Sequence, residues 1–407
     1  MSGVVITATG VISAAGTGPS NVLDAMAAGV GFVKEGRTWP AATIDPSQAP
    51  WPDGKPWVDN RKYANVAALR AVAAARLALQ SDEPRGDDDD SVRCGIVMAV
   101  GSSASDGLGE VMPRLAAMAE TDPRPLAKLL YDEVPDYSYI RGIPSQIGQF
   151  VAIASGFRGS NVAVYGEGGA GGLGAMAAAI RLLESSELDR VLVVGVQPPL
   201  MPTLSVAYDR DDPLGTEAAP GRGPFDVQRA GTLIGEGAAA LMLERVEMAR
   251  ARGIAPAAEI VACEAICATS RARALDAAVS LVMAGDSQRP DCWWAHAAGS
   301  VVMDRDECHV VGPRAGAPVT SSKGTIGNAF ECAALIDVAL AVEALRQRWL
   351  PPVGLLRQPD PALGKLDVVM GAPRSLPAHG SALVTAFSHG SDAATAAAAL
   401  ISTGGTS

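Results

Sequence analysis

Aromatic residues are scarce in this chain, at 4% of its 407 residues, although 48% of the residues are hydrophobic. Ala, Val, Leu and Ile must therefore fill a core large enough for two domains or one large duplicated domain. A basic surplus is also lacking: the net charge of −11 argues against nucleic acid or an anionic membrane surface as main partner. No stretch approaches the roughly 20 apolar residues of a spanning helix, and no basic start marks a signal peptide. We expect a cytoplasmic protein.

Cysteine pairs with metal-binding or redox spacing are absent as well. Cys263 and Cys267 lie four residues apart, but no nearby histidine or second cysteine pair completes a metal site. The six cysteines are scattered, with no Cys-x-x-Cys pair: Cys94, Cys263, Cys267, Cys292, Cys308 and Cys332. We therefore expect reduced, mostly buried thiols, and we assign no metal and no cofactor.

Strand-like and helix-like segments alternate along the chain, which predicts an α/β protein. In the first part, strands are expected at 4–8, 94–100, 161–165, 190–196 and 238–243, with helices at 21–28, 63–80, 144–155, 173–183 and 244–252. In the second part, strands near 257, at 292–297 and near 368, 383 and 396 accompany helices at 270–284 and 325–345. The similar order of the two sets indicates a duplicated unit with halves 1–248 and 249–407.

The most informative absence lies in a glycine-rich turn between strand 161–165 and helix 173–183. The turn reads Gly166-Glu167-Gly168-Gly169-Ala170-Gly171-Gly172. A sharp strand-to-helix turn of this kind, here called the elbow, normally projects a Ser or Cys beside backbone N–H groups that stabilise an oxyanion. This elbow contains no Ser, Thr or Cys. We therefore expect a scaffold for acyl chemistry that lacks its attacking atom.

A nucleotide phosphate could also be held by glycines in this pattern. However, no acidic residue ends the next strand, 190–196, to hold a ribose, and no Lys follows the glycines as in a phosphate-binding loop. Close backbone packing at a tight turn explains the glycines better.

A second motif reads Gly223-Pro224-Phe225-Asp226-Val227-Gln228-Arg229-Ala230-Gly231, followed by Gly235-Glu236-Gly237-Ala238. It matches every fixed position of Pro-Phe-Asp-x-x-Arg-x-Gly-x-x-x-Gly-Glu-Gly-Ala. With it the chain resembles β-ketoacyl-acyl-carrier-protein synthases, the condensing enzymes of fatty acid and polyketide assembly. We expect Asp226 and Arg229 to pair and brace this loop. Trp293 and Trp294 lie at strand spacing, so one is expected in the core and the other towards a neighbour.

The resemblance covers nearly the whole chain, including segments 4–13, 295–300, 321–328 and 386–391. It implies an α/β, thiolase-like duplicated fold, with two similar mixed-sheet halves in a layered α/β/α/β/α arrangement.

The resemblance also implies which residues occupy the family's active site. Working members use a Cys as acyl acceptor, two His residues that polarise the malonyl carbonyl and stabilise the enolate, and a supporting Lys. The Cys position falls on Gly169, the two His positions on His296 and Asn328, the Lys on Lys323, and Phe387 lies in the last turn of the site. Gly169 cannot form a thioester, and Asn328 cannot carry a proton at neutral pH. We therefore expect no active catalytic residue, with His296 satisfied in a vestigial pocket and Lys323 a structural cation.

Within the family, this profile resembles chain length factors, which lack the nucleophile and pair with an active ketosynthase in type II polyketide systems. The family pairs across a two-fold axis through the strand before the elbow, here Asn161, Val162, Ala163, Val164 and Tyr165. Acyl carrier protein would reach the chain through this heterodimer. The cavity shared with the partner limits the growing polyketide, with segments 101–118 and 131–149 as candidate linings.

Two other functions stay open at this point. One is a self-sufficient malonyl-carrier-protein decarboxylase or acyltransferase that uses His296 and Lys323. The usual replacement for the family's Cys is Gln, and Gly169 offers no side chain for decarboxylation. The other is a thiolase-fold scaffold that binds another acyl enzyme without shaping its product.

Overall fold

The computed structural model describes residues 3–34, 41–79, 89–101, 128, 131–132, 137–166, 168–197, 221–284, 289–388 and 394–403. Its main sheet has the strand order β11-β10-β14-β15-β9-β1-β8-β6-β4-β5. These strands are β1 (Val4–Ser13), β4 (Cys94–Val100), β5 (Asn161–Tyr165), β6 (Arg190–Val196), β8 (Gly237–Arg245), β9 (Ala258–Ala268), β10 (Cys292–Trp294), β11 (Val319–Thr320), β14 (Ser381–Phe387) and β15 (Ala394–Ser402). Parallel and antiparallel pairs both occur, so the sheet is mixed.

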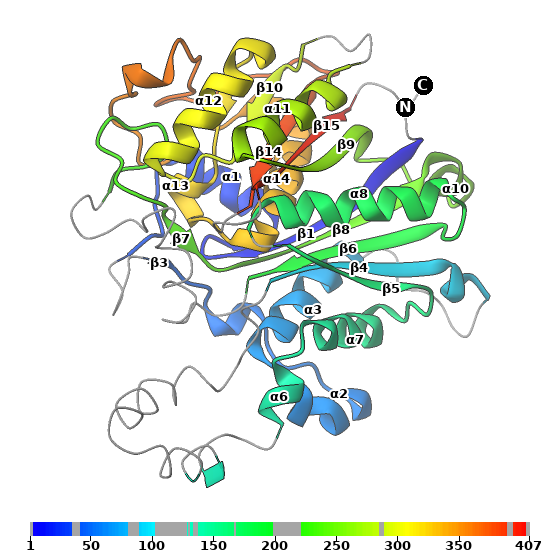
Figure 1. Ribbon diagram of the computed structural model, residues 1–407. Coiled ribbons are helices and arrows are strands. Elements are labelled where there is room, and N and C mark those ends of the chain that lie inside the picture. The colour runs from blue at the N-terminus through cyan, green and yellow to red at the C-terminus, as the bar shows by residue number, and fades with distance from the viewer. Residues whose placement is uncertain are drawn as a thin grey trace.

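Helices cover both faces of this sheet, and some of them pack against strands from both of its ends (Figure 1). They are α1 (Pro19–Ala27), α2 (Lys55–Asn60), α3 (Val66–Leu79), α6 (Ser138–Arg141), α7 (Pro144–Ser155), α8 (Ala170–Glu184), α10 (Val246–Ala251), α11 (Arg271–Val282), α12 (Val301–Ala315), α13 (Lys323–Ile326) and α14 (Ala333–Gln347). In Figure 1, α3 and α7 lie below strands β4, β6 and β8, with α8 above them; α11 and α12 lie over the strands of the C-terminal part.

Alternation of side chains along single strands explains the layers. In β6, Val191 and Val193 pack with α8 and α14, whereas Leu192 and Val194 pack with α3 and α7. In β15, alternate alanines contact α8 and α14 on one face and α11 and α12 on the other. Strands buried on both faces read as continuous apolar runs, and small residues let the layers approach closely. The predicted α/β class is confirmed; the division into halves 1–248 and 249–407 stays a prediction.

The predicted bounds of strands 94–100, 161–165 and 190–196 and of helix 144–155 agree with β4, β5, β6 and α7. The single helix predicted at 325–345 is wrong, because α13 ends at Ile326, before Gly327 with its φ of +71°, and α14 begins only at Ala333. The strand predicted near 368 is a single bridge between Val319 and Val368. Helix α12 was not predicted. None of the helices in the described part of the chain is long and apolar enough to cross a membrane.

The two tryptophans are both buried, so the prediction that one meets a neighbour is wrong. Strand β10 lies between β11 and β14, second from one end of the sheet, and helices cover both of its faces. Trp293 packs with the α11 and α12 layer and donates its indole N–H to Thr385 Oγ1 at 2.8 Å, and Trp294 packs on the opposite face. Five of the six cysteines are buried free thiols, and Cys267 is exposed.

Candidate functional site

The elbow is a tight turn that joins β5 to α8. Gly168 has φ +82°, a conformation that favours glycine, and bridges to Ser388. Gly169 is the N-cap of α8, with φ −59° and ψ −30°. Two N–H groups of the first helical turn are bonded within the turn: Gly171 donates to the Gly168 carbonyl at 3.0 Å, and Gly172 donates to that of Gly169 at 3.2 Å. The elbow therefore has the predicted strand-to-helix geometry.

Gly169 faces His296 and Phe387. A Cβ atom built on Gly169 would lie 3.1 Å from His296 Nδ1 and 3.4 Å from the Phe387 carbonyl oxygen. His296 is buried, and its ring meets the Phe387 ring edge-on at 5.7 Å between centroids. The structure thus brings these three residues together, from α8, the loop after β10, and the end of β14. Any side chain at position 169 would point at the imidazole.

Lys323 lies at the start of α13 in a buried ion pair with Asp337 of α14. Its Nζ also donates to the Ala295 carbonyl at 3.4 Å, and Ser322 Oγ donates to the second Asp337 oxygen at 2.6 Å. Burial raises the pKa of Asp337, while Lys323 and Ser322 oppose that rise. The charge of Lys323 is therefore opposed by a carboxylate next to it.

Asn328 is buried in the turn between α13 and α14. Its Oδ1 accepts a hydrogen bond from the Phe330 N–H at 3.1 Å, which stabilises the turn at Phe330, where φ is +40°. Its backbone bonds to Leu233 and Gly235 at 2.7 and 2.9 Å. The oxygen of this amide is thus engaged in local structure.

A buried carboxylate that the sequence analysis missed holds the His296 loop. Glu307 of α12 accepts hydrogen bonds from the backbone N–H groups of His296 and Ala297 at 2.8 and 2.9 Å, and from Thr385 Oγ1 at 2.5 Å. Burial raises the pKa of Glu307 to about 7, against the lowering effect of these hydrogen bonds. One turn earlier, Asp304 Oδ1 accepts from the Ala298 N–H at 3.0 Å. In the sequence, the only sign of this arrangement was that Asp304 and Glu307 lie three residues apart, in a segment for which no element was predicted.

Arg229 is paired differently from the prediction. Its guanidinium contacts Asp304 at 3.5 Å and Asp360 at 2.7 Å. The Asp226 carboxylate instead accepts backbone N–H groups of Gln228, Arg357 and Gln358 at 2.8 to 3.1 Å. The predicted Asp226–Arg229 ion pair is therefore wrong, although both residues brace the loop, since Arg229 also donates to the main-chain carbonyl of Asp226.

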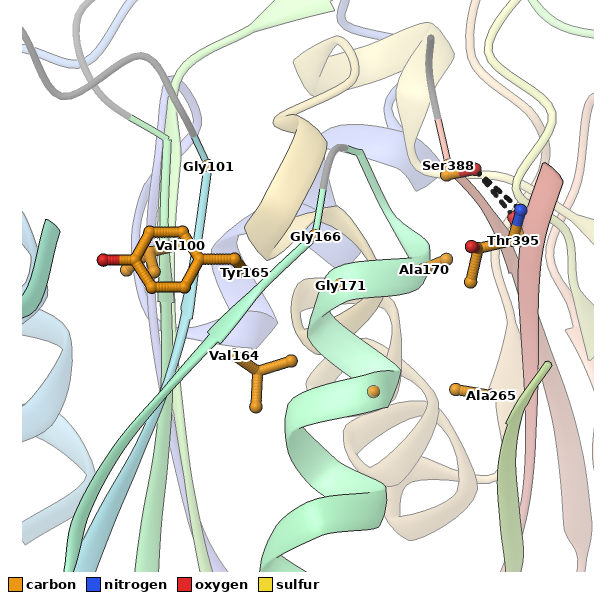
Figure 2. Close-up of a pocket in the computed structure, with 11 residues that line it drawn as sticks. Val100, Gly101, Val164, Tyr165, Gly166, Ala170, Gly171, Ala265, Ser388 and Thr395 are labelled. Atoms are coloured by element: carbon orange, nitrogen blue, oxygen red, sulfur yellow. Dashed lines mark hydrogen bonds between the residues drawn. The ribbon is translucent and has the colours of Figure 1, made fainter. Parts of the chain in front are cut away.

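A cavity of about 410 Å³, here called the elbow cavity, opens beside the elbow. Figure 2 shows it between the end of β5, the first turns of α8, Ala265 of β9 and the paired Ser388 and Thr395. Its size is within the usual range of small-molecule sites. Its lining residues are Val100, Gly101, Val164, Tyr165, Gly166, Ala170, Gly171, Gly174, Ala265, Ser388 and Thr395.

The sequence predicted two segments, 101–118 and 131–149, as linings of a cavity, and neither accounts for the elbow cavity. Gly101 lines the elbow cavity, but the rest of segment 101–118 lies outside the described residues. The described part of segment 131–149 contributes nothing to this lining. The walls from β9 and β15 were not predicted.

Residues 1–249 match the family model described as "Beta-ketoacyl synthase, N-terminal domain". The chain belongs to the β-ketoacyl synthase family. The tetracenomycin polyketide synthase ketoacyl synthase beta subunit of Streptomyces glaucescens is 34% identical over 240 residues, covering 56% of this chain and 58% of that protein. The aligned part of the chain thus spans little more than half the length of this relative.

Two solved structures share the fold over nearly the whole chain. A β-ketoacyl synthase from Burkholderia phymatum STM815 superposes with a TM-score of 0.81 at 24% identity, covering 98% of each chain. The ishigamide ketosynthase/chain length factor gives a TM-score of 0.77 at 23% identity, covering 99% of each chain. The mixed α/β fold of this protein is thus that of ketosynthases.

Proposed function

We propose that this chain is the nucleophile-free, chain-length-factor subunit of a type II polyketide ketosynthase, and that it works only when paired with an active ketosynthase. The observation that carries the proposal is Gly169. It lies at the elbow, facing His296, and has no side chain to form a thioester; the family resemblance implies that this is the position of the acyl acceptor. The remaining site residues hold structure: Lys323 is paired with Asp337, and Asn328 stabilises its own turn.

The free edge of β5 supports pairing with a partner. Among the described strands, β5 pairs only with β4, so one row of its backbone groups faces outward. Its end residue Tyr165 is 63% exposed. An unprotected edge strand is a template for another chain, and tyrosine is enriched at interfaces. The Streptomyces glaucescens relative is named a beta subunit, which agrees with a chain that has a partner.

We propose that the partner supplies the thiol and the acyl carrier protein contact, and that this chain supplies part of the wall around the growing product. The alternative of a stand-alone decarboxylase would need His296 and Lys323 to act on malonyl thioesters without a covalent acceptor. The close pairing of Lys323 with Asp337 weighs against it, because the carboxylate opposes the positive charge that would stabilise an enolate.

The test is to purify the chain alone and after co-expression with candidate ketosynthases, then supply malonyl-carrier protein to each. The proposal expects co-purification at equal stoichiometry, chain extension by the complex, and neither carbon dioxide release nor an acyl adduct from the chain alone. Turnover by the isolated chain would favour the decarboxylase. A complex whose product length never depends on this subunit would favour the scaffold.

A further inference from the structure

We propose that the groove between residues 177–184 of α8 and 261–264 of β9, here called the seam groove, selects the partner subunit. It binds a basic side chain, carried on an extended segment of the ketosynthase, between Glu184 and Glu264. The inference rests on the proposed function, which supplies the ketosynthase. It adds a second contact beside the β5 edge and the charge that the partner must carry there.

The seam groove has a volume of about 260 Å³ and meets β9 along one edge of the strand. Its residues are Ala177, Ile180, Arg181 and Glu184 of α8, and Val261, Ala262, Cys263 and Glu264 of β9. Side chains of a strand point alternately to its two faces, so four consecutive residues border one groove only along an edge. Strand β9 pairs with β15 from Glu259 to Ala268, but with β1 only at Ala258 and Glu259. Beyond Glu259, β15 is the only described strand that pairs with β9.

The charged side chains of the seam groove have no partner of opposite charge in the part of the chain that the structure describes. Arg181 and Glu184 are exposed and Glu264 is half-buried, and none of the three forms a salt bridge with a described residue. By contrast, Glu187 at the same end of α8 accepts a hydrogen bond from Ser160 Oγ at 2.7 Å. Two carboxylates against one guanidinium leave a negative surplus, which favours a basic group.

The shape of the seam groove favours an extended stretch of protein. Main-chain N–H and C=O groups along a strand edge form hydrogen bonds with another extended chain. The apolar side chains of Ala177, Ile180 and Val261 suit the hydrocarbon stem of a lysine or arginine, whose charged end stays near water. An extended segment with one long basic side chain therefore satisfies both the edge and the carboxylates.

The seam groove lies close to the strand that we propose for ketosynthase pairing. A Cβ on Gly174 of α8 would lie 3.9 Å from Val164 Cγ1 of β5 and 3.8 Å from Ala265 Cβ of β9, so α8 lies between these two strands. Arg181 follows two turns later on the same helix. Figure 1 shows α8 running between β9 and the strands β4 and β5. A ketosynthase paired along β5 would therefore have the seam groove beside it.

Strand β5 by itself does not distinguish between partners. Its residues 161–165 carry no charge, and hydrogen bonds to its backbone do not depend on the sequence of the added strand. A second copy of this chain would pair there equally well. That copy brings a net charge of −11, so the carboxylates of the seam groove disfavour it, whereas they attract a basic segment.

The first experiment measures the affinity of the chain for its ketosynthase by calorimetry at low and at high salt. Combining Glu184→Gln with Glu264→Gln should weaken binding roughly tenfold at low salt and less at high salt, because salt screens these charges. Arg181→Gln removes the positive charge of the seam groove and should strengthen binding about twofold. Glu247→Gln on α10, which does not line the seam groove, is the control and should leave the affinity unchanged.

The thermal unfolding temperature of each variant confirms folding. Unchanged affinity in the double carboxylate variant, or weaker binding after Arg181→Gln, would overturn the inference. The selecting role is measured with the chain alone, by sedimentation: the double carboxylate variant should self-associate about fivefold more tightly than the wild type. Equal self-association would refute selection against a second copy.

The second experiment locates the segment directly. Arg181 is replaced with the photoreactive p-benzoylphenylalanine in the purified ketosynthase complex, and the adduct is mapped by mass spectrometry. We expect an adduct on one ketosynthase segment that contains lysine or arginine. An adduct on a segment without a basic residue, or no adduct, refutes the role of the seam groove, while formation of the complex leaves the proposed function standing. If no ketosynthase binds the wild-type chain, the proposed function and this inference both fail.

Discussion

Placing a thiol at position 169 tests whether the site formed by Gly169, His296 and Phe387 can activate a nucleophile. In Gly169→Cys, the new Cβ would lie 3.1 Å from His296 Nδ1, and the backbone angles at 169 suit any L-residue. A cysteine at a helix N-terminus beside an imidazole has a lowered pKa, whereas an ordinary thiol titrates at about 8.5. We expect the variant thiol to titrate at least one pH unit lower, a tenfold higher ratio of thiolate to thiol, equivalent to about 1.4 kcal/mol.

The assay is the pH dependence of iodoacetamide alkylation, followed by intact mass after incubation with an acyl thioester. Ala170→Cys is the matched control, because it is one residue along the same helix start and its side chain lines the elbow cavity (Figure 2). The tight contact with the imidazole should cost about 1–3 kcal/mol of stability, partly offset by about 0.4–1 kcal/mol from the stiffer unfolded chain. We expect an acyl adduct without condensation, since Asn328 cannot act as the second histidine. An ordinary titration in Gly169→Cys, indistinguishable from that of Ala170→Cys, would refute this reading of the site.

Three further predictions concern the buried charges and the sheet edge. Glu307 has a pKa of about 7 in the folded state, against about 4.5 in the unfolded state, so the folded state binds more protons between these values. The free energy of unfolding should therefore fall by roughly 3 kcal/mol as the pH rises from 4.5 to 7. Urea unfolding of the wild type and of Glu307→Gln across this pH range measures the difference. Lys323→Met should destabilise by about 3–5 kcal/mol because Asp337 is left unpaired, and adding Asp337→Leu should recover most of that loss. Replacing Asn161 and Tyr165 of β5 with lysine should weaken ketosynthase binding at least 100-fold, about 2.7 kcal/mol, by calorimetry.

Controls for these variants come from exposed positions. Glu247→Gln, at a side chain that is 62% exposed, should leave the pH dependence of stability as in wild type. Leu281→Lys, at a 53% exposed residue of α11, should not weaken ketosynthase binding. A Glu307→Gln variant with the wild-type pH dependence would contradict the role of burial at that carboxylate. Full ketosynthase affinity in the β5 lysine variant would place the interface elsewhere.

The sequence predicted those elements whose burial follows a simple pattern. Strands β4 and β6 are apolar on both faces and end at Gly or polar residues, so their bounds could be read directly. Helix α12 escaped because its buried face includes Asp304 and Glu307, which hold backbone N–H groups of another loop. An amphipathic pattern cannot reveal a helix whose inner face is acidic. The break at Gly327 escaped for a related reason, since the backbone of Asn328 bonds to Leu233 and Gly235, far away in sequence.

Site residues were easier to place by motif than by physical pattern. The family resemblance pointed to Gly169, His296 and Phe387, and the structure brings them together. It could not show the elbow cavity, because the cavity lies between residues of different elements, among them Gly174 of α8 and Ala265 of β9. The pairing of Arg229 was missed because its acidic partners are far away in the sequence. Asp304 lies on α12, and Asp360 lies in a loop more than a hundred residues after Arg229.

Shared residues and hydrogen bonds connect the site around Gly169 and His296 to the elbow cavity. Glu307 binds Thr385 on β14, and two residues later Phe387 contacts the His296 ring. The next residue, Ser388, bridges to Gly168 of the elbow and bonds to Thr395, forming one wall of the cavity. Because this buried polar network links β14 and β15 to the elbow at the start of α8, we expect substitutions at His296 or Glu307 to change the shape of the elbow cavity.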